Sequence, residues 1–177
     1  RRVTRIKIVC ALMLVGLLGS NIILTSEFIK TNVLAWKLER SNDNWKFEEA
    51  SLLTKMGDLL YFQDHKNKAE IWYRRALELN PGESRTLNNL AWLLTENHLG
   101  DQKRLKESME LAQKALAGKK TAFIWDTLAE AYFRNGLYEK AADAAHNALE
   151  RAEEGNGISV EADLDYYRKR FKQMAGE

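Results

Sequence analysis

The pattern of hydrophobic and polar residues predicts helices along the whole chain. Ala, Leu, Glu and Lys recur at steps of three and four residues, as amphipathic helices require. Val, Ile and Thr do not alternate with polar residues in the manner of strands. The chain contains a single proline, Pro81, so long helices are seldom interrupted. We therefore predict an all-α fold.

An uncharged, apolar stretch occupies residues 8–26. As a helix it would be roughly 28 Å long at ~1.5 Å per residue, which nearly matches the hydrocarbon thickness of a bilayer. The residues just before it are basic: Arg1, Arg2, Arg5 and Lys7. We predict a transmembrane anchor over residues 1–27 with a cytoplasmic N-terminus, which places the rest of the chain on the extracytoplasmic side.

A cleaved secretory signal is the alternative interpretation of this stretch. Cleavage requires small residues at the third and first positions before the cut, whereas a cut after Ser20 would put Leu18 at the third position. An uncleaved anchor is therefore favoured. Gly16 and Ser20 form a small-xxx-small pair that permits close packing against another membrane helix. We expect at least one membrane-embedded protein partner.

A stalk helix is predicted over residues 28–48, with Ile29, Val33 and Trp36 on one stripe. Trp36 suits either an interfacial anchor at the lipid headgroups or packing against the next domain. The run Ser41 to Asn44 offers several N-cap residues and is interpreted as the boundary between the stalk and a folded domain.

A repeating arrangement of small and large residues begins after this boundary. Its members in the first unit are Leu53, Met56, Gly57, Leu60, Ala69, Tyr73, Ala76 and Pro81. The spacing closely resembles the tetratricopeptide repeat, a helix pair of about 34 residues. We expect Gly57 and Ala69 at the close crossing of helices A and B, Tyr73 between neighbouring units, and Pro81 just after helix B. This unit spans residues 49–83.

Two further units carry the same spacing. The second, residues 84–121, has Leu87, Leu90, Ala91 and Leu94 in helix A, and Ser108, Ala112 and Ala115 in a helix B that begins about five residues late. The long turn between them is interpreted as a tolerated insertion, with a contact loop as the alternative. The third, residues 122–155, has Trp125, Leu128, Ala129, Tyr132, Ala141, Ala145 and Ala148, and Asn135-Gly136 is expected to end its helix A.

A last amphipathic helix is predicted within residues 156–177. Its apolar stripe consists of Val160, Leu164, Tyr167, Phe171 and Met174. Such a helix suits a cap on the final repeat, with the basic run 168–172 as its solvated face. The predicted fold is thus an N-terminal transmembrane helix followed by an α-solenoid of three tetratricopeptide pairs and a capping helix.

The resemblance also implies a binding surface, because helix A of each unit lines the concave groove of the family. Carried over residue by residue, the groove would contain Lys55, Asp58, Tyr61, Phe62, Arg85, Asn88, Asn89, Trp92, Phe123, Asp126, Glu130, Phe133 and Arg134. Aromatic side chains beside Arg and Asn favour recognition of a peptide or helix. The alternative is that Trp92 and Phe133 pack within the fold.

Other classes of site find little support in the sequence. The family's chaperone-tail binders use Lys and Asn where this chain has Thr54 and Asp58, and only Asn89 matches their pattern. With the four N-terminal basic residues set aside, acidic side chains slightly outnumber basic ones, which argues against nucleic acid. His65, His98 and His146 are too scattered for a metal site, and Cys10 is the single cysteine. We predict no metal, cofactor, small-molecule substrate or catalytic group.

The predicted function is therefore a membrane-anchored scaffold, an accessory or assembly subunit of a larger membrane complex. The single-pass topology suits the bacterial inner membrane, with the repeats in the periplasm. Bacterial proteins of similar layout assist cytochrome c maturation or support respiratory, secretion and envelope complexes. The alternatives are an N-anchored organelle receptor with cytosolic repeats and a non-catalytic subunit of a membrane enzyme.

Overall fold

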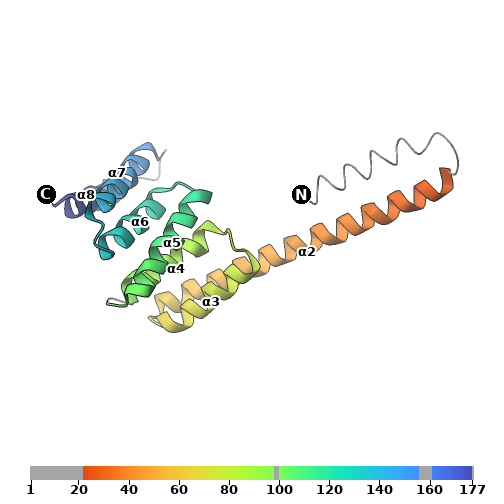
Figure 1. Ribbon diagram of the computed structural model, residues 1–177, viewed down its shortest axis with the longest axis horizontal. Helices are drawn as coiled ribbons and strands as arrows, with labels where there is room; N and C mark the ends of the chain where they lie inside the picture. The colour runs from red at the N-terminus through yellow and green to blue at the C-terminus, as the bar shows by residue number, and fades with distance from the viewer. Residues whose placement is uncertain (1–21, 98–99, 156–160, 177) are drawn as a thin grey trace. The chain divides into compact units, whose positions relative to one another are not determined.

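The computed structural model describes residues 22–97, 100–155 and 161–176. Within these ranges every regular element is an α-helix (Figure 1). The helices are α2 (Ile22–Phe62), α3 (Lys66–Leu79), α4 (Ser84–Asn97), α5 (Gln102–Gly118), α6 (Ala122–Arg134), α7 (Tyr138–Glu154) and α8 (Glu161–Ala175). The prediction of an all-α fold is confirmed.

The chain divides into two compact units, residues 1–45 and 46–177. The division falls beside the predicted boundary, but the predicted helix start at Ser41 to Asn44 is wrong, because α2 continues through it. An N-cap side chain bonds backbone N–H groups that lack a partner at the start of a helix. Here the residues preceding Ser41 are already helical, so these amides face carbonyls one turn earlier and no cap is needed.

The first unit is described from Ile22 onward. Ile29, Val33 and Trp36 are all exposed in it, and the Arg40 guanidinium lies 5.2 Å from the Trp36 ring centroid. Gly16, Ser20 and most of the predicted anchor, residues 8–26, lie outside the described residues. Among the residues that are described, no helix is both long enough and apolar enough to cross a membrane.

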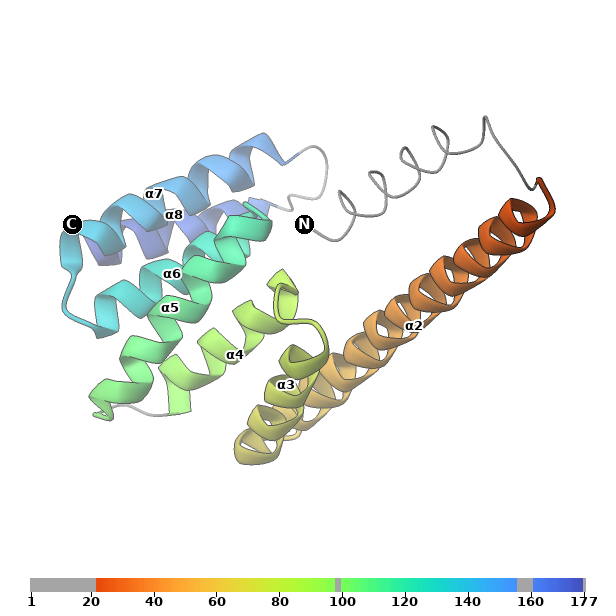
Figure 2. The same ribbon diagram turned by 45° about the vertical axis from the view of Figure 1, so that its right-hand side comes forward.

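The second unit contains the predicted helix pairs (Figure 2). The small residues assigned to close crossings are fully buried: Ala69, Ser108, Ala112, Ala129 and Ala141 all have 0% exposure. A Cβ atom on Gly57 would lie 2.5 Å from Tyr73 Cε1, so only glycine fits where α2 meets α3. The predicted packing role of the small residues is confirmed.

Helix ends follow the local chemistry. Gly136 has a φ of 74°, and the N–H groups of Gly136 and Leu137 donate to the carbonyls of Phe133 and Tyr132 at 3.0 Å, which forms a Schellman motif. The Asp101 carboxylate caps α5 by accepting from the backbone N–H of Lys103 at 3.1 Å. The predicted long turn thus occupies only the residues between Asn97 and Gln102.

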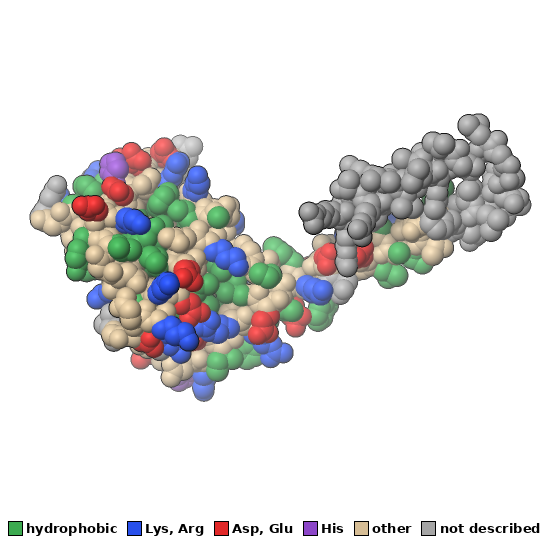
Figure 3. Space-filling view, in the orientation of Figure 1, with side chains coloured by type: hydrophobic (Ala, Val, Ile, Leu, Met, Phe, Trp, Pro, Cys, Tyr) green, Lys and Arg blue, Asp and Glu red, His purple; other side chains and the backbone are tan. Residues whose placement is uncertain are grey.

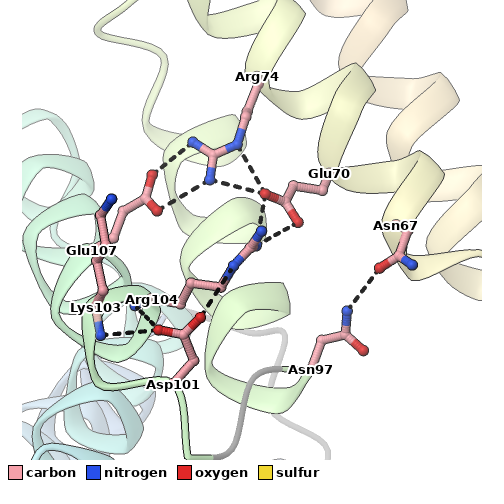
Figure 4. A network of polar contacts seen from close by, with 8 residues as sticks. All are labelled: Asn67, Glu70, Arg74, Asn97, Asp101, Lys103, Arg104 and Glu107. Atoms are coloured by element: carbon pink, nitrogen blue, oxygen red, sulfur yellow. Dashed lines mark hydrogen bonds and ion pairs between the residues drawn. The ribbon is translucent and has the colours of Figure 1, made fainter.

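A network of charged side chains joins α3 to α5 (Figure 4). Arg104 Nη1 donates to both carboxylate oxygens of Glu70 at 2.9 Å, and Arg74 donates to both oxygens of Glu107 at 2.6 and 3.1 Å. Burial tends to raise the pKa of Glu70, but hydrogen bonds from Arg104 and Arg74 outweigh it and hold this pKa below its usual range. Long side chains therefore bridge two neighbouring B helices.

Helix α8 covers the end of the third pair. Met174 is buried and Phe171 packs against the same apolar cluster, as predicted for a cap. Val160 and the side chain of Leu164 lie outside what the structure describes. The expectation that residues 168–172 form a solvated face is wrong for Arg170, whose side chain is only 14% exposed because it pairs with Asp126 and Glu130 of α6.

Candidate functional site

Helices α2, α4, α6 and α8 of the second unit all contribute side chains to one surface, which we call the inner face. We call the surface of α3, α5 and α7 the outer face, because side chains bridge α3 to α5 and a shared pocket joins α5 to α7. A groove of about 570 Å³ opens on the inner face, and we call it the inner groove. It is lined by Asp58, Tyr61, Phe62, Tyr73, Arg85, Asn88, Asn89, Trp92, Phe123, Asp126, Thr127, Tyr166 and Tyr167. All four inner helices contribute, and Tyr73 reaches it from α3.

Most of the predicted groove residues come together there. The inner groove contains Asp58, Tyr61, Phe62, Arg85, Asn88, Asn89, Trp92, Phe123 and Asp126 from that set. The structure places the other four, Lys55, Glu130, Phe133 and Arg134, outside its lining. Lys55 is exposed outside the groove, and Glu130 is buried in ion pairs with Arg134 and Arg170. Phe133 packs on the apolar core, with its ring centroid 5.4 Å from that of Tyr138, so it is part of the fold.

The sequence analysis missed Tyr73, Thr127, Tyr166 and Tyr167. Tyr166 and Tyr167 lie on α8, which was expected only to cap the solenoid. In the structure α8 extends the inner face, in the place that helix A of a further repeat would take. Tyr166 lies five residues after the start of α8, as Asn89 lies five residues after the start of α4, but the start of α8 is known only from the structure.

Asp58 organises one end of the inner groove. Its carboxylate accepts hydrogen bonds from Arg85 Nη2 at 2.6 Å, Asn89 Nδ2 at 2.7 Å and the Tyr73 hydroxyl at 2.9 Å. Burial, together with the bond to Asp58, raises the pKa of Tyr73. The carboxylate is therefore already satisfied within the fold.

A second chain of hydrogen bonds fixes two aromatic side chains. Trp92 Nε1 donates to the Tyr61 hydroxyl at 3.0 Å, and this hydroxyl donates to Glu96 at 2.6 Å. Burial and the bond to Glu96 raise the pKa of Tyr61 to about 12. Both rings thus keep fixed positions in the groove wall at neutral pH.

The capping helix neutralises the acidic residues of α6. Arg170 donates to Asp126 through Nε at 2.9 Å and to Glu130 through Nη2 at 2.6 Å, while the Tyr166 hydroxyl donates to Asp126 at 2.7 Å. Burial, followed by the bond to Asp126, raises the pKa of Tyr166. Asp126 consequently presents little free negative charge to a ligand.

What the inner groove leaves available to a ligand is aromatic surface. Phe62 is 83% exposed and Phe123 is 48% exposed. The Asn88 side chain is buried, and its Oδ1 atom has no hydrogen-bond partner within the described part of the chain. Charges of both signs are interspersed over the face of this unit that Figure 3 shows. Such a site suits an uncharged or mixed segment of a protein better than a phosphate or nucleic acid.

Residues 22–97, 100–155 and 161–176 contain no group of three or more His, Cys, Asp or Glu side chains that could hold a metal ion. His65 is exposed, and His146 lies beside Glu150 with 3.4 Å between Nε2 and Oε1. His98 lies outside the described residues. The carboxylates of the groove are hydrogen-bonded to fixed donors rather than to a nucleophile.

The chain matches no described protein family and no curated protein sequence. Solved structures do match. The Arabidopsis OM64 TPR domain has a TM-score of 0.58 and 19% identity over 72% of this chain and 98% of that domain. The TPR2B domain of yeast Sti1, in complex with pHsp70, has a TM-score of 0.57 and 20% identity over 73% of this chain and 98% of that chain. The first TPR of Spaghetti (RPAP3), bound to the HSP90 peptide SRMEEVD, has a TM-score of 0.54 and 17% identity over 69% and 92%.

The chain contains a tetratricopeptide-type solenoid. The likeness to these domains and the buried small residues at each helix crossing agree on this point. At such identities the likeness establishes the fold alone. The resemblance found in the sequence is therefore confirmed for the repeats, and the anchor remains a prediction.

The tetratricopeptide groove of this chain differs from a clamp for chaperone tails at the two positions noted in the sequence. Thr54 is buried, with its hydroxyl 2.7 Å from that of Thr86 and bonded to the Ala50 carbonyl at 2.9 Å. Asp58 brings a carboxylate to the position where the resemblance implies an Asn in chaperone-tail binders. Since like charges repel, we expect an acidic terminus to be disfavoured there.

Proposed function

We propose that the chain is a non-catalytic, membrane-anchored scaffold whose inner groove holds a segment of a partner protein. The observation that carries the proposal is that two large aromatic side chains, Phe62 and Phe123, are exposed in one groove. Flat aromatic side chains fill partner pockets at low entropic cost.

Neighbouring structures support a protein ligand, because TPR domains are protein-interaction modules and two of these were solved with Hsp70 or HSP90 ligands. The ligand proposed here is nevertheless not an acidic C-terminal tail. Asp58 and Thr54 replace the family's Asn and Lys, so an internal or apolar segment fits better.

The proposal includes a membrane anchor over residues 8–26 in the bacterial inner membrane and a repeat domain on its extracytoplasmic side. Its support is the uncharged length of this stretch and the basic residues before it. Protease added to spheroplasts is expected to degrade the repeats from outside. Full protection of the repeats would refute this topology.

The groove is tested with the full chain carrying Phe62→Ala and Phe123→Ala. Both rings are exposed, so helicity by circular dichroism is expected to stay unchanged. Co-purification in mild detergent followed by mass spectrometry is expected to show a membrane protein captured by the native chain and reduced about tenfold with the variant.

The matched control is Ile71→Ala, which removes an exposed apolar side chain from α3, outside the inner groove. This control is expected to capture the same partner as the native chain. Equal capture by the groove variant and the control would reject the inner groove as the binding surface.

A further inference from the structure

A second concave site lies on the outer face, away from the inner groove. It has a volume of about 510 Å³ and is bounded by α5, α6 and α7; we call it the outer pocket. Its floor is apolar, with Leu116 from α5 and Trp125 and Leu128 from α6. Gln113, Lys120, Lys140 and Asn147 stand among its polar lining residues.

The repeat explains why the outer pocket is open. Each B helix begins its packed face with a fully buried small residue: Ala69 in α3, Ser108 in α5 and Ala141 in α7. Aligning these three positions gives a common numbering for the B helices. In this numbering Arg74 of α3 corresponds to Gln113 of α5, and Glu107 of α5 corresponds to Lys140 of α7. The ion pair that bridges α3 and α5 therefore has no counterpart between α5 and α7.

The side chains at these positions turn to Tyr132 instead. Gln113 Nε2 donates to the Tyr132 hydroxyl at 3.1 Å, and Lys140 Nζ lies 5.9 Å from the centroid of the Tyr132 ring. Neither Lys120 nor Lys140 forms an ion pair with a carboxylate of the described residues. The two ammonium groups are thus available at the rim.

Trp125, whose ring lies in the wall of the outer pocket, carries a buried donor. Trp125 Nε1 is buried, and no acceptor within the described ranges bonds it. Trp125 and Tyr132 lie two turns apart on α6, or roughly 10 Å along its axis. Lys120, which precedes α6, stands at the Trp125 end, and Lys140 stands at the Tyr132 end.

We propose that the outer pocket binds an acidic amphipathic segment of a partner protein. Apolar side chains of the segment cover Leu116, Trp125 and Leu128, while its carboxylates pair with Lys120 and Lys140. Asp143 is the acidic group in the lining, and against it stand the two ammonium groups of Lys120 and Lys140. This complementarity selects an acidic ligand over a basic one.

The test uses the full chain in nanodiscs of zwitterionic lipid, labelled with ¹⁵N-tryptophan. The probe is a synthetic helical peptide with leucines along one face and glutamates flanking them. The chain has 5 tryptophans, and Trp125→Phe assigns the relevant indole resonance. The glutamate peptide is expected to shift the Trp125 indole resonance, and the same peptide with lysine for each glutamate is expected to leave it unmoved.

Variants make the assignment specific. Lys120→Glu with Lys140→Glu is expected to weaken binding of the glutamate peptide about tenfold or more. Gln113→Arg with Lys140→Glu, which builds a bridging ion pair across the pocket, is expected to weaken this binding to a similar extent. The matched control is Lys114→Glu, an exposed lysine outside the lining, which is expected to bind as the native chain does.

Three results would overturn the proposal. Equal binding of the lysine peptide would remove the charge argument, and an unmoved Trp125 resonance would remove the site. A Trp125 shift produced by anionic vesicles but not by the glutamate peptide would assign the pocket to a membrane surface instead. The inner-groove variant Phe62→Ala with Phe123→Ala leaves this pocket intact, so failure of the two proposals is distinguishable.

Discussion

The two junctions between neighbouring B helices follow one repeat geometry, but one is bridged by ion pairs and the other contains an open pocket. Between α3 and α5, Glu70, Arg74, Arg104 and Glu107 meet as alternating charges and bridge the helices. Between α5 and α7 the corresponding surface holds the outer pocket. The fold sets the distance between the helices, whereas the side chains at the edges of each junction decide whether ion pairs bridge it or a pocket stays open.

The largest expected effects come from the buried leucines that pack against both B helices at each junction, which we call the floors of the two junctions. Leu90 and Leu128 occupy the same position of their repeats and are 1% and 3% exposed. Leu90→Ala and Leu128→Ala are each expected to lower the free energy of unfolding by about 2–4 kcal/mol, because each leaves a cavity. Urea unfolding followed by circular dichroism measures both. A loss under about 1 kcal/mol at Leu128 would mean that the second floor is loosely packed, and the comparison would fail.

The next largest effect distinguishes the side chains that border the two junctions. Glu70→Gln removes the charge that Arg104 and Arg74 both contact, and we expect a loss of about 1–2 kcal/mol in unfolding free energy. This value lies between those of exposed and buried ion pairs, since the arginines are partly solvated. The corresponding change at the second junction, Met109→Gln, is expected to cost at most about 0.5 kcal/mol. Similar losses at both positions would show that the ionic bridge has no special role.

Acid titrates the same bridge. The pKa of Glu70 is lowered in the folded chain, so its contribution to stability is full above the unfolded value of about 4.3 and is lost as the pH falls through the folded value. We expect the stability difference between the native chain and Glu70→Gln to be constant near neutral pH and to shrink below about pH 4. A difference that stays constant into strong acid would contradict the ion pair.

The smallest effect comes from transplanting the bridge. Gln113→Arg with Lys140→Glu places the Arg74–Glu107 pair at the second junction, and an exposed pair of this kind is expected to add at most about 1 kcal/mol. A double-mutant cycle on unfolding free energies isolates the pair from the single changes. A coupling of zero would indicate that α5 and α7 are too far apart there for the pair to form.

The inner groove shows how far the sequence reaches. Tyr61, Trp92 and Phe123 were assigned to the groove from their positions in helix A, because the repeat fixes which side of that helix faces inward. Phe133 was assigned by the same rule and packs on the core, since an aromatic ring at the end of α6 finds an apolar surface beside Tyr138. Position on a helix predicts direction, but neighbouring side chains decide exposure.

The sequence by itself determined the helix pairs, their close crossings and the end of α6. These depend on local spacing, on small residues such as Gly57 and Ala69, and on the positive φ of Gly136. Only the tertiary structure decided that Arg170 turns inward to Asp126 and Glu130, and that Gln113 and Lys140 leave a pocket open. Those outcomes depend on contacts between residues far apart in the chain. A charged side chain in the sequence is compatible with solvent or with a buried partner until the fold supplies one.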